Sequence, residues 1–326
     1  LAEWLRRHGA ILTQEDVRNY QPVIREPVRG AYRGFDVIGP PPPCSGGVHV
    51  VQMLNLLSHF DVAALGYGTA DGVHLLLEAM KIAAADRARY MGDPAFLDVP
   101  VARLISQAYA RERLAEIDMR QARAFAHGRL DNESANTTHV TVADKQGNVV
   151  ASTQTINSLF GARMVIPGTG VIANNYMYLF DPHSGRAMSI EPGKRLTSAQ
   201  APLIVSKDGR PRLALGLPGG TRIYSTALQT IVNVIDHGMA LQDAVEAPRV
   251  WTQGQEAEVE PAFDGVVAQA LAQRGHAVQQ VAHIGGGMCA VEFHGDGSMT
   301  GAACWRADGA PAGISGGNAK EGVTFW

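Results

Sequence analysis

Two threonines and a histidine stand together near the middle of the chain, in the stretch DNESANTTHVTVADKQGNVV from Asp131 to Val150. A threonine hydroxyl is a weak nucleophile, which attacks a carbonyl only where a base is positioned beside it. Thr137, Thr138 and His139 therefore supply residue types that could perform nucleophilic chemistry. Threonine is also a preferred strand residue, so the pair taken alone is better explained as the start of a β-strand after a polar loop.

Other stretches with a chemical pattern do not fit their surroundings. GTGVIA, Gly168 to Ala173, matches the fingerprint G-x-G-x-x-A, but the residues after it do not open a helix and no βαβ alternation surrounds it. PGKR at Pro192 lacks the first glycine and the Ser or Thr of a phosphate loop. The histidines occur singly, and Cys44, Cys289 and Cys304 have no C-x-x-C spacing. We therefore expect no cofactor and no metal site.

Composition narrows the class of protein. The 326 residues are 46% apolar and 18% charged, enough to bury a core in one large or two average domains. A formal charge of -3 offers no basic surface for nucleic acid, and no apolar run reaches the ~18 residues of a membrane span. We expect a small-molecule or peptide partner. Because the chain starts at Leu1 within a helical pattern, it looks like an excerpt that lacks an upstream portion.

The elements that must position these residues follow from periodicity and turn chemistry. Before Asn136 the pattern predicts short helices at 1–8 and from Thr13, where TQED resembles a capping box, strands within 26–39, and helices over 48–57, 70–91 and 102–126. After Asn136 it predicts hairpins over 137–155, 203–217 and 288–305, and helices over 224–237 and 241–247. Hairpins flanked by amphipathic helices indicate an α+β fold with an antiparallel sheet core.

Seven stretches gain meaning when they are considered together. In order, they are PPPCSGGVHVVQMLNLL, ADRARYMGDPAF, NTTHVTVADKQGN, TQTINSLFGARM, GTGVIANN, EPGKRLTSAQAPLIV and LGLPGGTRI. Their order and approximate spacing resemble the γ-glutamyltranspeptidase family of the N-terminal-nucleophile hydrolases, from Leu1 to about Arg306. The resemblance implies a four-layer αββα sandwich, in which helices cover antiparallel sheets. It also implies that the first part of the large subunit is missing from this sequence.

The resemblance implies a precursor that cuts itself between Asn136 and Thr137. Residues 1–136 would be the C-terminal, mostly helical portion of the large subunit, and residues 137–326 the small subunit, interleaved in one domain. The two subunits stay associated in the family, and a dimer of such heterodimers stays open. The cut would give Thr137 a free α-amino group, which titrates near pKa ~7.7–8.0 and can serve as its base. Thr138 is the less favoured nucleophile.

Three further positions match catalytic motifs of the family. Thr155 matches a second threonine, whose hydroxyl bonds to the nucleophile. Gly219 and Gly220 match a pair whose backbone N–H groups form an oxyanion hole, where one donor contributes ~2.7–4 kcal/mol to the transition state. The structural alternatives are a surface strand threonine and a plain turn after Pro218.

The positions that would hold a substrate ammonium depart from the family. Asn157 matches an asparagine that binds the α-amino group of glutamyl substrates, but Tyr176 and Leu179 replace a glutamine and an aspartate. A buried cation without an anionic partner is costly. A free α-amino group should therefore bind poorly, unless Asp181 swings in.

The carboxylate end of the site also departs from the family. Ser198 matches the first of two adjacent serines, and Ala199 takes the place of the second. The segment from Asp181 to Gly193 is shorter than in members that fold a lid over the site. We expect an open groove that admits a bulkier acyl group and lets water compete with an amine.

Three functions stay open. The first is a self-processing amidohydrolase or acyltransferase that forms an acyl-enzyme on Thr137, cleaving γ-glutamyl amides such as glutathione by hydrolysis or transfer. The second is a cephalosporin-acylase-like or oxamate-hydrolase-like amidase that acts on a non-glutamyl small amide. The third is a non-catalytic binding homologue. The resemblance implies a periplasmic or extracellular location, and a cytoplasmic one stays open.

Overall fold

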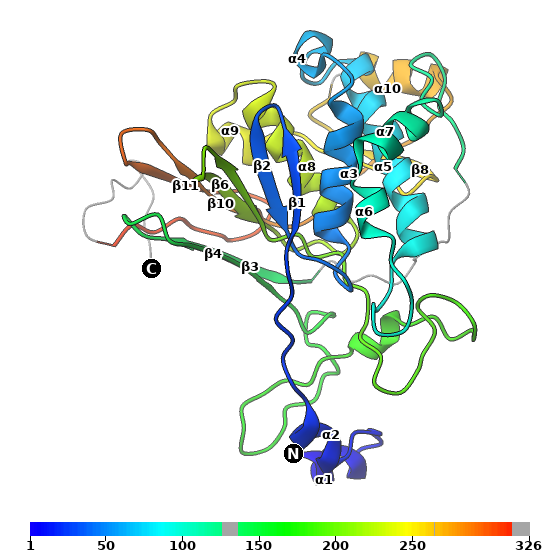
Figure 1. The fold of residues 1–326 in the computed structure, drawn as a ribbon, viewed down its shortest axis with the longest axis vertical. Helices are drawn as coiled ribbons and strands as arrows, with labels where there is room; N and C mark the ends of the chain where they lie inside the picture. Colours follow the sequence, from blue (N-terminus) through cyan, green and yellow to red (C-terminus); the bar gives the residue numbers. More distant parts are fainter. Residues whose placement is uncertain (126–135, 264, 315–326) are drawn as a thin grey trace.

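The computed structural model of the chain describes residues 1–125, 136–263 and 265–314. At the N-terminus, α1 (Ala2–Arg7) and α2 (Gln14–Asn19) form an arm that lies apart from the main body (Figure 1). The capping box expected at the start of α2 is present. The Thr13 hydroxyl accepts from the Asp16 N–H at 3.1 Å, and the Asp16 carboxylate accepts from the Thr13 N–H at 2.7 Å.

A six-stranded antiparallel sheet forms the centre of the main body, in the order β1-β2-β5-β6-β10-β11. Its strands are β1 (Val28–Tyr32), β2 (Phe35–Gly39), β5 (Leu203–Lys207), β6 (Arg210–Gly216), β10 (Cys289–Phe293) and β11 (Met299–Ala303). The strand pairs predicted within 26–39, 203–217 and 288–305 are confirmed. Because β2 pairs with β5, with Val37 opposite Val205, segments from before and after Asn136 share one sheet.

Helices cover one face of this sheet (Figure 1). Helix α3 (Gly46–Leu57) is buried along its whole length, and packs on β1 and β2 and beside α5 (Ala70–Tyr90) and α8 (Arg222–Ile235). Helix α3 and strand β2 approach so closely that a Cβ on Gly39 would lie 2.7 Å from the Cα of Gly47. The helices predicted over 48–57, 70–91 and 224–237 are thus confirmed, as is α9 (Leu241–Glu246), which packs on β10 and β11.

The single helix predicted over 102–126 is wrong. The chain instead forms α6 (Val101–Leu104) and α7 (Gln107–Leu114), and residues 115–125 are not helical, while residue 126 lies outside the described residues. The break has a local cause. The Ser106 hydroxyl accepts from the Tyr109 N–H at 3.1 Å and so caps a new helix in mid-segment.

The sequence pattern missed four elements in the last third of the chain. They are β7 (Val250–Trp251), β8 (Glu256–Val259), α10 (Gly265–Gln273) and β9 (Ala277–Gln280). The three strands form a separate sheet, in which β8 and β9 run parallel. The expected antiparallel sheet core is present in the six-stranded sheet, and this small sheet differs from it because α10 connects β8 to β9 as a crossover.

The hairpin predicted over 137–155 is confirmed as β3 (Thr138–Ala143) and β4 (Val149–Gln154). It forms its own two-stranded sheet and packs against β6 and β10, on the sheet face opposite the helices (Figure 1). The main body thus consists of a helical layer, the six-stranded sheet and the hairpin, with the three-stranded sheet beside α5. This arrangement confirms the α+β class.

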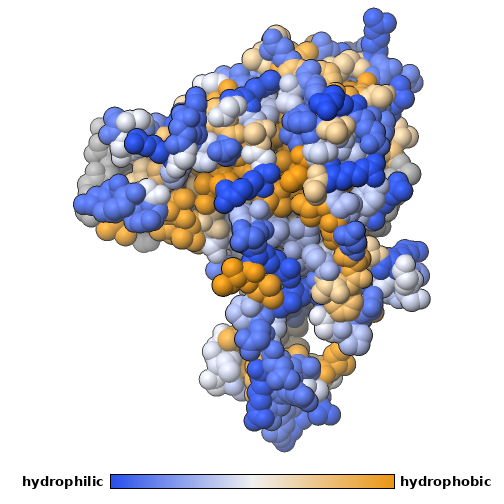
Figure 2. All heavy atoms as spheres, viewed as in Figure 1, coloured by the Kyte–Doolittle hydropathy of each residue, from blue (hydrophilic) through white to orange (hydrophobic). Residues whose placement is uncertain are grey.

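The two faces of the β3–β4 hairpin differ. Its inner face carries His139, whose ring lies against Gly216 so closely that a Cβ there would be 2.2 Å from the ring. Its outer face carries Val140, Val142 and Val150, which are 47%, 57% and 60% exposed. Apolar side chains also reach the surface across the middle of the main body in the space-filling view (Figure 2). Among the described helices, none is long and apolar enough to cross a membrane.

Candidate active site

Most residues expected to do chemistry line one cleft. Its lining consists of Thr137, Thr155, Asn157, Tyr176, Leu179, Ser198, Ala199, Gln200, Gly220 and Ile223. Gly219 is not part of this lining but precedes Gly220 directly. Every described residue of the lining follows Asn136 in the sequence, so residues 1–125 contribute support to the cleft rather than surface.

The β3–β4 hairpin brings the two expected catalytic threonines together. Thr137 precedes β3 and Thr155 follows β4, and the register pairs Thr138 with Gln154 at the same end of the hairpin. The Thr155 hydroxyl donates to the carbonyl oxygen of Asn136 at 2.9 Å and accepts from the Asn157 N–H at 2.8 Å. The Thr155 hydroxyl was expected to bond to the nucleophile Thr137. In this uncut chain it donates instead to the Asn136 carbonyl, which belongs to the peptide bond that Thr137 would attack. A donor on a carbonyl oxygen stabilises the negative charge that attack creates.

His139 has a structural role and does not line the cleft. Its Nδ1 lies 2.7 Å from the Thr153 hydroxyl, and its Nε2 lies 2.9 Å from the Thr141 hydroxyl. Burial lowers the pKa of His139 to about 4, so the ring is neutral at pH 7. Because both ring nitrogens are engaged under the hairpin, His139 fixes the strand that begins beside Thr137 and is not placed to act as its base.

Gly219 and Gly220 have backbone conformations that favour glycine, with φ of 144° and 59°. Their carbonyl groups accept from the N–H groups of Arg222 and Ile223 at 3.2 and 3.1 Å, and so lead into α8. Within the described ranges, the N–H groups of the two glycines donate to no protein atom. The pair therefore offers two backbone donors next to the cleft, one of them on the residue that lines it.

A buried arginine supports this glycine pair from behind. Arg249 is 3% exposed, and its Nη1 donates to the carbonyls of Ile284 and Gly286 at 2.9 and 3.0 Å. The Gly286 N–H in turn donates to the Pro218 carbonyl at 2.9 Å, and a Cβ on Gly219 would lie 3.0 Å from the Cα of Gly285. Arg249 therefore holds the loop against which Gly219 packs. Nothing in the sequence near Arg249 indicates this role.

The Asn157 amide is fixed by a neighbouring side chain. Asn157 is 4% exposed, adopts a φ of 72°, and its Nδ2 donates to Asn175 Oδ1 at 3.1 Å. The same Asn175 oxygen accepts from the Ser158 N–H at 3.1 Å. The short 3₁₀ helix η1 (Tyr176–Leu179) follows directly, and both of its end residues line the cleft. Tyr176 and Leu179, the two positions that depart from the family motif, are therefore both part of the cleft lining.

Asp181 is not in the cleft lining. Its carboxylate accepts from the His183 N–H at 2.9 Å and lies 2.8 Å from His183 Nδ1 and 3.0 Å from Arg186 Nη1. These bonds, the His183 N–H foremost, lower the pKa of Asp181 to about 2. A swing into the cleft would break them, so the structure argues against that role. None of the described residues that line the cleft is acidic.

The stretch PPPCSGG supports the cleft wall at Ser198. Ser198 and Cys44 form a parallel bridge, in which the Ser45 N–H donates to the Ser198 carbonyl at 2.8 Å. The Ser198 hydroxyl lies 3.3 Å from Cys44 Sγ, and the Ser45 hydroxyl accepts from Arg87 Nε at 2.9 Å. The stretch is thus structural, as the sequence suggested, and it joins the segments on either side of the expected cut.

Gln200 and Ile223 line the cleft although neither was expected to. Each lies within a few residues of a motif position, Gln200 in LTSAQAP and Ile223 in PGGTRI. Their motif neighbourhood is the one signal that could have found them. Residue type alone could not, because neither side chain has a chemical role that is specific to such a site.

Comparison with known proteins agrees with this geometry. The profile of the gamma-glutamyltranspeptidase family matches residues 1–314. The chain belongs to this family. Among gamma-glutamyltranspeptidase relatives, the Acylase ACY 1 proenzyme of Pseudomonas sp. (strain SE83) is 58% identical over 100% of this chain and 58% of its own length. The Glutathione hydrolase proenzyme of Escherichia coli (strain K12) is 40% identical over 85% of this chain and 51% of its own length.

A solved structure shares the fold of this chain. The crystal structure of cephalosporin acylase from Bacillus halodurans has a TM-score of 0.87 and 31% identity, over 97% of this chain and 58% of that one. The chain therefore spans little more than half the length of each of these relatives.

Proposed function

We propose that Thr137 is the nucleophile of a self-processing amide hydrolase. In the first reaction its hydroxyl oxygen attacks the Asn136 carbonyl carbon, whose oxygen is held by Thr155. The C–N bond breaks, the hydroxyl proton passes to the nitrogen, and an ester joins Asn136 to the Thr137 side chain. Water then hydrolyses the ester, leaving a carboxylate on Asn136 and a free amine on Thr137. The hydrogen bond from Thr155 to Asn136 is the observation that supports this step.

The second reaction uses the same hydroxyl on an external amide. The freed α-amino group takes the Thr137 proton, because such a group titrates near neutral pH. The tetrahedral oxyanion accepts from the N–H groups of Gly219 and Gly220, and the proton passes to the leaving amine. Water releases the acyl group as an acid, and an amine acceptor would release it as a new amide. The convergence of Thr137, Thr155 and Gly220 on one cleft supports catalysis over a purely binding role.

We propose that the preferred acyl group carries no free α-ammonium. The observation that carries this choice is the cleft lining, where Tyr176 and Leu179 stand and the described residues include no acid. An ammonium bound there would lose its water without gaining an anionic partner, which is costly. The 58% identity to a protein named as an acylase supports the same choice.

γ-Glutamyl amides such as glutathione form the second candidate. Asn157 and Ser198 line the cleft, and both match residues that bind glutamyl substrates in the family. Relatives named as glutathione hydrolases are 40% identical to this chain. These observations favour glutamyl recognition through Asn157 and Ser198, although Leu179 stands where the family has the acid that pairs with the ammonium.

A matched pair of substrates separates the two candidates. γ-Glutamyl anilide and glutaryl anilide differ only in the α-amino group, so the ratio of their kcat/KM values reports ammonium recognition directly. We expect the full-length protein to prefer the glutaryl compound by at least about tenfold, equal to about 1.4 kcal/mol. A preference of that size for the glutamyl compound would overturn the acylase proposal and support the second candidate.

The subunit organisation is part of the same proposal. Residues 1–136 would form a portion of the large subunit and residues 137–326 the small subunit, associated through the pairing of β2 with β5. In a complete four-layer αββα sandwich, a further layer would cover the outer face of the β3–β4 hairpin. The exposure of Val140, Val142 and Val150 supports this arrangement.

A further inference from the structure

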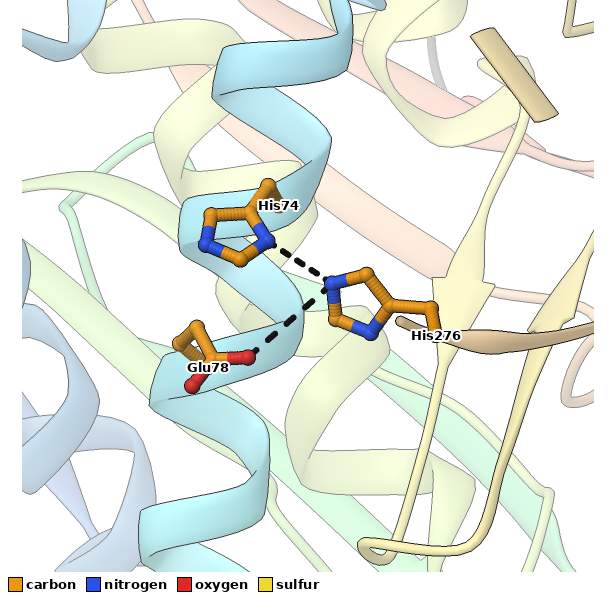
Figure 3. Close-up of side chains that lie close together, drawn as sticks. All are labelled: His74, Glu78 and His276. Atoms are coloured by element: carbon orange, nitrogen blue, oxygen red, sulfur yellow. Dashed lines mark hydrogen bonds and ion pairs between the residues drawn. The ribbon is translucent and has the colours of Figure 1, made fainter. Parts of the chain in front are cut away.

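Two histidines and a glutamate meet in the interior, away from the cleft lining. His74 and Glu78 lie one turn apart on α5, and His276 directly precedes β9 (Figure 3). The three side chains are buried, and one nitrogen or oxygen atom of each lies within 4.8 Å of the others. These residues are 202 positions apart in sequence at the widest, so the spacing of histidines along the chain did not reveal the cluster.

The orientation of His74 is fixed by the backbone. Its Nε2 lies 2.9 Å from the Asp118 carbonyl oxygen, which can only accept, so Nε2 carries the proton. Its Nδ1 therefore presents a lone pair, and it faces His276 Nε2 at 2.7 Å. A ring that donates one N–H to a carbonyl and presents its other nitrogen is the usual arrangement of a metal-binding histidine.

Glu78 completes the group from the same helix face as His74. Its Oε1 lies 3.9 Å from His276 Nε2 and forms an ion pair with the Lys81 ammonium. The other carboxylate oxygen, Oε2, accepts from the Arg123 N–H at 3.4 Å. Lys81 also donates to the Arg123 carbonyl at 2.6 Å, so its ammonium keeps a partner if Glu78 turns toward the histidines.

We propose that His74 Nδ1, His276 Nε2 and Glu78 Oε1 bind one divalent transition-metal ion of the zinc type. Two imidazoles and one carboxylate form a common zinc ligand set, with ligand bonds of about 2.0–2.2 Å. Two nitrogens at such distances from a tetrahedral ion lie roughly 3.3 Å apart, so the rings must separate by about 0.6 Å from their present contact. The proton between them moves to His276 Nδ1, and both lone pairs then point to the metal.

The position of the site indicates what the ion would do. It would link α5 to the start of β9, and hence to the three-stranded sheet that packs beside that helix. None of its three ligands lines the cleft. The ion would therefore stabilise the fold and would take no part in attack by Thr137.

Metal binding can be measured on the whole protein without an activity assay. After treatment with a chelator, we expect the protein to bind one equivalent of Zn²⁺ by calorimetric titration and to melt at a higher temperature. One equivalent of Co²⁺ should give the visible d–d absorption of a tetrahedral site with nitrogen ligands. His276→Gln and Glu78→Gln should each weaken Zn²⁺ binding by at least about tenfold. His59→Gln, at an exposed histidine, is the matched control and should bind as the parent does.

Two results would overturn the proposal. One is a parent protein that binds neither ion and whose melting temperature does not respond to them. The other is unchanged binding in His276→Gln, which would place the ion elsewhere. If the variants do not fold, the Co²⁺ spectrum of the parent protein decides alone. In either negative case the cluster is a hydrogen-bonded polar group that holds α5 against β9 without a metal.

Discussion

The Thr155 hydroxyl donates a 2.9 Å hydrogen bond to the backbone carbonyl of Asn136. The acceptor belongs to the peptide bond that joins Asn136 to Thr137, so the end of one strand holds the carbonyl at the start of the other. Removing the donor should slow self-cleavage about 10²- to 10³-fold, as loss of one oxyanion donor does. Thr155→Val keeps the shape without the hydroxyl, and Thr155→Ser should restore the rate. The intensities of the uncut and cut bands on a gel, followed over time, measure the cleavage rate of each variant. Cleavage of Thr155→Val at the parent rate would contradict this role.

Thr137→Ala should abolish both self-cleavage and amide turnover, because it removes the hydroxyl that the proposal assigns as the nucleophile. Thr138→Ala is the matched control, since its side chain is on the exposed face of β3. The parent protein and the control should give two bands, and sequencing of the new N-terminus should begin with a threonine. A Thr137→Ala protein that still appears as two bands would refute the assignment.

Gly220→Ala should lower kcat by at least about tenfold with little change in KM, because a φ of 59° is unfavourable with a Cβ and its N–H would move away from the oxyanion. Gly209→Ala is the control. It has a φ of 73° and open space around the added Cβ, and it lies in the turn between β5 and β6. The control should cost stability of about 1 kcal/mol without changing kcat. Equal kinetic losses in both variants would show that backbone strain, and not the cleft position, is responsible.

Leu179→Asp should turn the preference toward γ-glutamyl donors, because it adds an anion to a cleft lining that has none among the described residues. The ratio of kcat/KM for γ-glutamyl anilide over glutaryl anilide should rise at least about tenfold. Leu179→Asn introduces a side chain of nearly the same shape as aspartate but without the charge. It should leave the ratio close to that of the parent. A rise of the same size in both variants would assign the effect to polarity or space and not to charge.

Stability should fall in mild acid. Burial lowers the pKa of His139 from 6.5 to about 4. Between these two pH values the unfolded chain binds more protons than the folded one, so the unfolding free energy decreases as the pH falls from about 6.5 to about 4. The share of His139 is on the order of 3 kcal/mol, and buried His49, whose pKa is also about 4, adds a loss of the same sign.

Denaturant unfolding of His139→Gln at several pH values tests the contribution of His139 to the pH dependence of stability. We expect a lower stability at pH 7, because bonds to Thr141 and Thr153 are lost, and a flatter decline toward pH 4. His59→Gln should follow the parent curve, since His59 is exposed. A decline in His139→Gln as steep as in the parent would assign the acid sensitivity to other groups.

The sequence predicted the parts of the molecule that have local signals. The turn DKQGN and alternating strand residues placed the hairpin that carries Thr137, and the capping box at Thr13 placed α2. The cleft positions Thr155, Asn157 and Ser198 came from motif resemblance, because each is an ordinary polar residue outside its motif. That they line one cleft was expected from the resemblance, whereas the bond to Asn136 required coordinates.

The features that were missed depend on contacts between distant segments. Strands β7 to β9 are two to four residues long, too short to show a period. Arg249 supports the glycine pair through backbone carbonyl groups some 35 residues away. Every residue has such a carbonyl, so the sequence does not show which residues accept from Arg249. His74 and His276 meet only because α5 and the start of β9 come together.

The pairing of β2 with β5 has a further thermodynamic consequence. A cut before Thr137 would leave these strands on different polypeptides, with Val37 and Val205 still opposite each other. Unfolding would then release two molecules from one, and mass action would make the melting temperature rise with protein concentration. The uncut chain would show no such dependence. Self-cleavage would thus make the melting temperature of the protein depend on its concentration.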